Sequence, residues 1–172
     1  MAKLIFLDET GATTNLVRTR GRCRKGQRLL ASAPHGHWKI TTFVAGLRCD
    51  RITAPFVVAQ PMNGVIFLTY VREVLCPTLE PGDIVVMDNL SAHKVAGVRE
   101  TIEATGARLL LLPPYSPDLN PIEQMFAKLK SLLRKAAKRT IPQLWDAIGE
   151  YLERFPANEC RNYLTNSGYA ST

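Results

Sequence analysis

The chain has 172 residues, of which 46% are hydrophobic and 22% are charged, and its formal net charge is +7. This composition is ordinary for a soluble globular protein, and the length indicates one self-sufficient domain over residues 1–172. The basic charge favours a polyanionic partner such as nucleic acid. It comes with no stretch approaching the ~20 apolar residues of a membrane span, so we expect no membrane association.

In the first half of the chain, the residue pattern predicts three strands and one helix. Short β-branched or apolar runs are typical of strands, and apolar residues at helical spacing are typical of amphipathic helices. Pro55 indicates a sheet edge or a bulge, and Asn63 is a suitable helix N-cap. In chain order, these patterns predict strands at 3–7, 38–47 and 52–59, then a helix at 63–79.

In the second half, strands and helices alternate before the chain ends in helices. The Pro-rich loop 113–121 separates the two regimes. The predicted order is a strand at 84–87, a helix at 94–105, a strand at 108–112, a long helix to about residue 139 and a helix at 142–155. This order is typical of an α/β protein with a mixed central β-sheet flanked by helices.

Four cysteines are spread along the chain without a Cys-x-x-Cys pair, which argues against a structural zinc site. They are Cys23, Cys49, Cys76 and Cys160. Scattered thiols in a sequence without a signal peptide are typical of a reducing compartment. We therefore expect a cytoplasmic protein.

Two of the apolar strands end in an aspartate, LIFLD at Asp8 and IVVMD at Asp88. Functional sites of open α/β sheets form at the carboxyl ends of strands, so the two acids meet if their strands are neighbours. Close carboxylates repel each other unless a cation joins them, and such oxygen ligands suit Mg²⁺ or Mn²⁺. The alternative is that each aspartate only caps the loop after its strand.

A third acid, Glu123, opens the long predicted helix. Asn120 fits the N-cap, Pro121 the first helical position, and Glu123 the position at which glutamate completes a capping box. A structural role in the cap is therefore one interpretation. The other is a metal site. The preceding loop PPYSPDLNP has four prolines, which restrict its backbone and thereby hold the carboxylate of Glu123 in a defined position.

The motifs FLDETG, VVMDNLSAHK and LPPYSPDLNPIEQMFAKLK resemble the catalytic core of mariner-like insertion-sequence transposases, which belong to the DDE endonuclease superfamily. The resemblance covers roughly residues 3–140. Thirty-four residues separate Asp88 from Glu123, a spacing similar to that of the family's second and third acids. The resemblance implies an RNase H-like fold in which Asp8, Asp88 and Glu123 are the catalytic acids and hold two Mg²⁺ or Mn²⁺ ions.

The activity that this resemblance implies is two-metal phosphodiester chemistry on double-stranded DNA. One metal activates water for cleavage or a DNA 3′-OH for strand transfer, and the other stabilises the leaving oxygen. The family performs cut-and-paste transposition, in which an element is excised between terminal inverted repeats and integrated at a TA dinucleotide. The alternatives are another RNase H-like nuclease and an inactive DNA-binding relic of a transposase.

Three polar residues beside the acids are candidates for supporting roles. His93 follows Asp88 by five positions and either contacts the metal ligands or DNA, or begins a helix without a chemical role. Asn89, next to Asp88, is expected to orient the site. Asn120 is the third candidate for a supporting role beside the acids.

Two basic clusters are candidate DNA-binding segments. The first has six cations in eleven residues with no acid, a density that favours a counter-charge over a solvated hairpin. The second lies on the long helix. The candidates are Arg18, Arg20, Arg22, Arg24, Lys25 and Arg28 in the first cluster, and Lys128, Lys130 and Arg134 in the second.

Two further expectations about partners follow from the resemblance. In similar transposases the segment after the first acid forms a clamp loop between two protomers, which implies a homodimer assembled on transposon ends and target DNA. Full transposases also carry helix-turn-helix domains before the first acid, whereas Asp8 stands near the start of this sequence. We expect a helix-turn-helix partner from an upstream reading frame or from a longer chain, and a bacterial, nucleoid-associated protein.

Overall fold

The computed structural model describes residues 3–18, 20–30, 32, 34–35 and 37–169, so the predicted domain limits 1–2 and 170–172 lie outside the described residues. Its centre is a sheet with the strand order β3-β2-β1-β4-β5. Strands β1, β2 and β3 pair antiparallel, whereas β1, β4 and β5 pair parallel, which confirms the predicted mixed sheet. The strands are β1 (Leu4–Thr13), β2 (Ile40–Leu47), β3 (Ile52–Val58), β4 (Ile84–Met87) and β5 (Arg108–Leu111).

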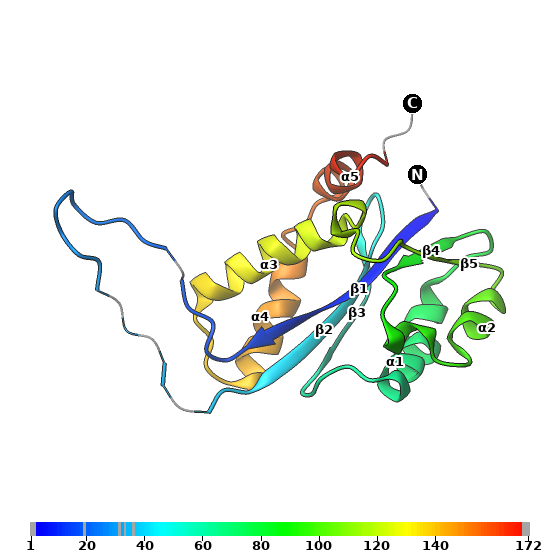
Figure 1. The fold of residues 1–172 in the computed structure, drawn as a ribbon, viewed down its shortest axis with the longest axis horizontal. Helices are drawn as coiled ribbons and strands as arrows, with labels where there is room; N and C mark the ends of the chain where they lie inside the picture. The colour runs from blue at the N-terminus through cyan, green and yellow to red at the C-terminus, as the bar shows by residue number, and fades with distance from the viewer. Residues whose placement is uncertain (1–2, 19, 31, 33, 36, 170–172) are drawn as a thin grey trace.

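Helices cover both faces of this sheet (Figure 1). One face carries α1 (Gly64–Tyr70), which continues as a π-helical turn (Val71–Leu75), and α2 (Val98–Glu103). The other face carries α3 (Ile122–Ala136), α4 (Ile141–Leu152) and α5 (Ala157–Asn166). Within the described part of the chain, no helix is long and apolar enough to cross a membrane.

Strand β1 divides its side chains between the two cores. Successive residues of a strand point to opposite faces. Ile5 and Leu7 accordingly pack with α1 and α2, while Phe6 packs with the helices of the other face. The same alternation turns Asp8 toward α3 and Glu9 toward α1, which is the basis of the site described below.

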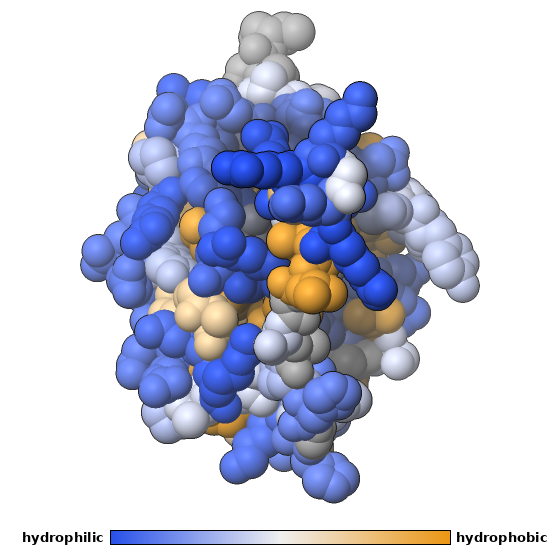
Figure 2. All heavy atoms as spheres, turned by 90° about the vertical axis from the view of Figure 1, so that its left-hand side faces the viewer, coloured by the Kyte–Doolittle hydropathy of each residue, from blue (hydrophilic) through white to orange (hydrophobic). Residues whose placement is uncertain are grey.

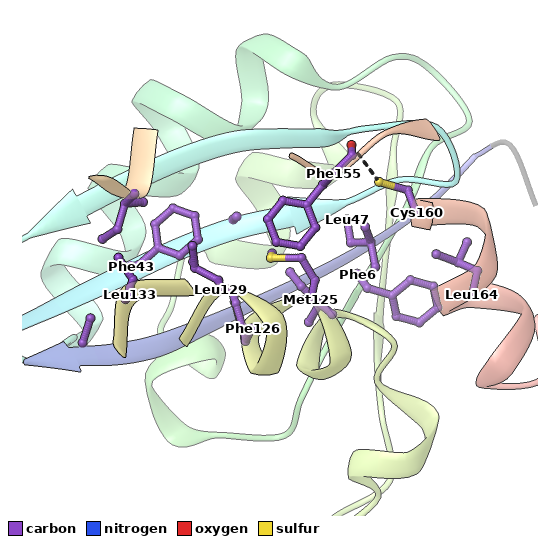
Figure 3. Packing of buried hydrophobic residues seen from close by; sticks show 14 of the residues in the cluster. Phe6, Phe43, Leu47, Met125, Phe126, Leu129, Leu133, Phe155, Cys160 and Leu164 are labelled. Carbon is purple, nitrogen blue, oxygen red and sulfur yellow. Dashed lines mark hydrogen bonds between the residues drawn. The ribbon is translucent and has the colours of Figure 1, made fainter. Parts of the chain in front are cut away.

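The core on the α3 side is built around one apolar stripe of that helix. Phe126 meets Phe43 of β2 edge-on, with ring centroids 6.0 Å apart. Figure 3 shows Met125, Phe126 and Leu129 packed among Phe6, Phe43 and Leu47. The buried members of this stripe are Ile122, Met125, Phe126, Leu129 and Leu133.

Pro55 confirms the expectation of both an edge strand and a bulge. β3 is at the edge of the sheet, and its register with β2 shifts between Val44 and Gly46. Ala54, next to the proline, has a φ of +49°. Because proline lacks an N–H, a central strand would lose a hydrogen bond at this position.

Several predicted boundaries were wrong. β1 continues to Thr13 because its second half pairs with β2. The helix expected at 94–105 is shorter, since Gly97, with a φ of +94°, separates α2 from a 3₁₀ turn at Ser91–Lys94. α5 was not predicted, because its only buried side chains are Cys160 and Leu164, which is too weak a pattern for sequence analysis.

A buried ion pair joins the end of β2 to the start of β4. Arg48 lies 2.7 Å from Asp83, and their side chains are 5% and 3% exposed. Arg48 also donates to the carbonyl of Thr78, and the N–H of Glu80 donates to Asp83. Burial opposes the charge of Asp83, but the hydrogen bonds from Arg48 and Glu80 outweigh it and hold the pKa of Asp83 below its usual value.

We expect Asp83→Ala to lower the free energy of unfolding by about 3–5 kcal/mol, because Arg48 is left as an unpaired buried charge. The lowered pKa of Asp83 means that this stabilisation is present above its unfolded pKa of about 3.9 and is lost as the pH falls through the folded value. Urea denaturation at neutral and acidic pH measures both effects. Asp50→Ala, in the exposed pair with Arg51, is the control and should change little. Equal effects of the two variants would contradict this account.

Candidate active site

The register between β1 and β4 places two of the predicted acids side by side. The strands are parallel neighbours and Leu7 pairs with Met87, so Asp8 and Asp88 occupy the next position on each. β4 ends there, as predicted. Asp8, however, lies within β1 and not at its carboxyl end, because β1 continues along β2 after its pairing with β4 has stopped.

All three predicted acids line one cavity of about 360 Å³. Asp8 and Asp88 reach it from the sheet, and Glu123 reaches it from the first turn of α3. The loop after β5 supplies much of the remaining wall, including Pro113 to Pro117. The structure therefore brings together residues that are separated by most of the chain.

Asp8 is buried, and both of its carboxylate oxygens accept hydrogen bonds. Oδ1 accepts from the N–H of Glu9 at 2.7 Å, and Oδ2 accepts from Nδ2 of Asn120 at 2.7 Å. Burial is the main cause that raises the pKa of Asp8 to about 7; the charges of Asp88, Glu9 and Glu123 raise it further, against the N–H of Glu9. Asp8 thus carries an electrostatic cost that a bound cation relieves.

The capping interpretation of Asn120 and Glu123 is wrong. α3 begins at Ile122, the residue before it is Pro121, and no side chain caps this end. The amide of Asn120 is used by Asp8, and only its backbone carbonyl receives the N–H of Glu123. Glu123 is consequently the second residue of the helix, outside a capping box, and its side chain is exposed along the cavity.

His93 connects Asp88 to Glu9, an acid for which the sequence pattern predicted no role. Its Nε2 lies 2.8 Å from Oε2 of Glu9, and its Nδ1 lies 2.6 Å from Oδ1 of Asp88. The Asp88 contact is an ion pair without the alignment of a full hydrogen bond. The ring is buried and packs against Phe67 of α1, with centroids 4.4 Å apart.

The two carboxylates determine the charge of this histidine. Burial lowers the pKa of His93, but its contacts with Asp88 and Glu9 outweigh burial and raise the pKa to about 10. Burial raises the pKa of Asp88, but the contact with His93 and the N–H of Leu90 outweigh it and hold that pKa below its usual value. Of the predicted supporting residues, His93 and Asn120 thus touch an acid, while Asn89 lines the cavity.

The donors at this site fit a hard divalent cation. Carboxylate oxygens are the ligands that Mg²⁺ and Mn²⁺ prefer. Among the described residues, no three His, Cys, Asp or Glu side chains are grouped closely enough to hold a metal ion as they stand. The acids share one cavity wall without forming a finished cage, as expected for like charges that repel each other.

The first basic cluster lies on the segment between β1 and β2, which extends far from the sheet (Figure 1). Figure 2 views the molecule from this side, which is largely hydrophilic with a small hydrophobic patch. In the described part of the segment, the large apolar residues that are exposed are Leu29, Leu30 and Trp38. All six predicted cations are exposed: Arg18, Arg20, Arg22, Arg24, Lys25 and Arg28.

The base of this segment is fixed to the body of the protein. The N–H of Thr14 donates to the carbonyl of Lys39, and the N–H of Lys39 donates to Oγ1 of Thr14. Arg139, just after α3, donates to the carbonyls of Thr14 and Leu16. The segment therefore starts and ends at one point beside α3.

The second basic cluster is only partly available to a partner. Lys128 lies 2.6 Å from Glu159 and above the ring of Phe155, so its charge is used within the chain. Lys130 and Arg134 are partly exposed on α3. These two remain candidates for DNA contact, and Lys128 is a weaker one than its position in the sequence indicates.

Comparison with known proteins agrees with the resemblance of the motifs. The model of a family described as DDE superfamily endonuclease matches residues 3–144. No curated protein matches the sequence.

Solved structures of a mariner transposase share the fold. A pre-cleavage Mos1 transpososome has a TM-score of 0.81 at 17% identity, over 96% of this chain and 53% of that one. A mariner Mos1 paired end complex with Mg has a TM-score of 0.75 at 17% identity, over 96% and 52%. The catalytic domain of Mos1 mariner transposase has a TM-score of 0.72 at 15% identity, over 96% and 77%. The chain thus spans about half the length of the first two, and its fold is the expected RNase H-like fold.

We expect His93→Leu to lower the free energy of unfolding by about 1–3 kcal/mol, because Asp88 and Glu9 lose their shared partner while the apolar contact with Phe67 is largely kept. Urea denaturation in a chelating buffer measures this. Lys94→Ala, at the exposed neighbouring position, is the control and should have almost no effect. A leucine variant as stable as the wild type would show that the contacts of His93 are energetically neutral.

Proposed function

Because this chain belongs to the DDE superfamily endonucleases, we propose that it is the catalytic domain of a cut-and-paste DNA transposase, over residues 1–172. It cleaves phosphodiester bonds of double-stranded DNA and joins a 3′-OH end to target DNA. The observation that carries this proposal is the convergence of Asp8, Asp88 and Glu123 on one cavity from two neighbouring strands and a helix.

The residues that would hold two Mg²⁺ or Mn²⁺ ions are Asp8, Asp88 and Glu123. Their oxygen donors fit this chemistry, and one of the similar structures is a Mos1 paired end complex with Mg. When bound, such ions activate the attacking oxygen and stabilise the leaving oxygen of an in-line displacement.

The other residues of the site keep the acids in place. Asn120 fixes one oxygen of Asp8, so that this carboxylate cannot rotate freely. His93 forms an ion pair with Asp88, and its other ring nitrogen is held by Glu9. Loss of such supporting contacts typically costs about 10–100-fold in metal affinity or activity.

The basic segment and α3 supply the contacts to DNA in this proposal. The exposed cations of the first basic cluster, together with the partly exposed Lys130 and Arg134, neutralise phosphates without reading sequence. The similar structures include a transpososome and a paired end complex, which supports binding to transposon ends. In this proposal the protein assembles on those ends and on target DNA as a homodimer. A helix-turn-helix partner recognises those ends, and we place the protein in the bacterial cytoplasm, at the nucleoid.

Two other functions are separated from this one by the same assay. Another RNase H-like nuclease cuts DNA or RNA with Mn²⁺ but does not join a 3′-OH end to a second duplex. An inactive relic binds DNA and cuts nothing. Joining of a pre-cut element end to a target duplex is therefore the decisive product.

We expect Asp88→Asn to reduce strand cleavage to background while folding and nonspecific DNA binding persist. Removal of a metal ligand abolishes stabilisation of the transition state, whereas binding to phosphates depends on lysine and arginine elsewhere. Cleavage of a DNA duplex with Mg²⁺ or Mn²⁺, with circular dichroism and a binding assay, measures the three properties. Near-normal cleavage by the variant would refute the metal-ligand role.

We expect replacement of Arg18, Arg20, Arg22 and Arg24 by serine to weaken DNA binding and to flatten its salt dependence. Each cation that no longer neutralises a phosphate lowers the slope of log K against log salt by about one unit. Salt-titrated binding gives the slope, and sedimentation shows whether dimerisation on DNA falls as well. The matched control removes the same charge at exposed positions elsewhere: Arg72, Lys94, Arg108 and Arg161. Equal slopes for both variants would mean that the segment acts only through net charge.

A further inference from the structure

Tyr115 has a backbone conformation and an exposure that are both unusual for an aromatic residue. Its φ is +56°, in the left-handed region that non-glycine residues rarely adopt. The residue is 101% exposed, so burial does not offset this strain. Strained residues persist where the surrounding structure imposes their conformation, and they cluster at functional sites.

The loop that carries Tyr115 is held at both ends. At its start, the N–H of Leu112 extends the β5–β4 ladder by donating to Met87, and two prolines follow. At its end, the side chain of Asn120 donates to Asp8, and the hydroxyl of Tyr169 donates to the carbonyl of Leu119. The exposed ring is therefore carried by a backbone with little freedom.

Tyr115 is one of the residues that line the cavity with the three acids. Leu90, two residues after Asp88, lines the same cavity and is 49% exposed. Carboxylates and a divalent ion can bind a phosphodiester, but an exposed aromatic ring and a leucine make no favourable contact with its charge. Apolar and aromatic side chains do contact the faces of bases, and such stacking tolerates any base.

We propose that Tyr115 stacks on an unpaired nucleobase next to the phosphodiester that the acids cut, with Leu90 as a second apolar contact. This inference rests on the proposed function. The ligand is a nucleotide withdrawn from the duplex stack, since a paired base has no free face to offer the ring. DNA that is already unpaired at this position, such as a forked duplex, is consequently the preferred ligand.

The test compares two DNA probes of the same sequence, one fully paired and one forked, with 2-aminopurine at the first unpaired position. Binding is measured by anisotropy in Ca²⁺, and stacking is measured by quenching of the 2-aminopurine fluorescence. We expect wild type to prefer the forked probe and to quench it. Loss of one stacked base corresponds to roughly a 5- to 150-fold loss of affinity, so Tyr115→Ala should lose this preference.

Three variants complete the design. Tyr115→Phe keeps the ring without the hydroxyl and should behave as wild type. Leu110→Ala removes an exposed apolar side chain on β5 that does not line the cavity, and should leave the preference unchanged. Tyr115→Asn places a residue that tolerates positive φ at this position, so its melting temperature should equal or exceed that of wild type while the preference is abolished.

Each contrary result has a distinct meaning. A wild type without preference for the forked probe, or a Tyr115→Ala variant that keeps the preference and the quenching, overturns the inference. A defect in Tyr115→Phe equal to that of alanine also overturns it, because the contact then belongs to the hydroxyl. A lower melting temperature for Tyr115→Asn would assign the ring a structural role. Absence of Mn²⁺-dependent cleavage by wild type, on either probe, contradicts the proposed function itself.

Discussion

The parallel hydrogen bonds between β1 and β4 hold Leu7 beside Met87, and thereby hold Asp8 beside Asp88. Because side chains alternate along a strand, a slip of one residue would turn Asp8 into the α1 core and bring Glu9 to the cavity. The register is secured by burial on both sides, since Ile5 and Leu7 fill one core and Phe6 the other. Packing of the strand residues that precede the two acids therefore determines which carboxylate faces which.

Carboxylates brought together in this way repel one another, and hydrogen-bond donors from distant segments of the chain offset part of this repulsion. Asn120 reaches Asp8 across 112 positions, and His93 reaches Glu9 across 84. These contacts hold the acids in place without neutralising all of their charge, as the raised pKa of Asp8 indicates. Tyr115 adds backbone strain to the same cavity wall. Repulsion between the acids and backbone strain both lower local stability at this cavity, and such a cost is common at functional sites.

Sequence patterns predicted the parts of the fold that depend on local order. Apolar runs located all five strands, and Pro55 indicated the edge and the bulge. The three acids were located through motif resemblance and spacing. Asn120 was predicted to support the acids, but not that its amide serves Asp8 instead of capping α3. Glu9 was missed, because it gains its role only through the folding of His93 against it. A helix with two buried side chains, such as α5, leaves too little periodicity to detect.

The anchoring of the basic segment, Arg18 to Arg28, also relates its position to that of Glu123. Arg139 ties the base of the segment to the chain just beyond the last turn of α3, and Glu123 stands in the first turn of the same helix. A helix of 15 residues is a stiff rod about 22 Å long. Its buried stripe from Ile122 to Leu133 fixes this rod against the sheet, so the base of the basic segment and Glu123 are held at opposite ends of one rigid element.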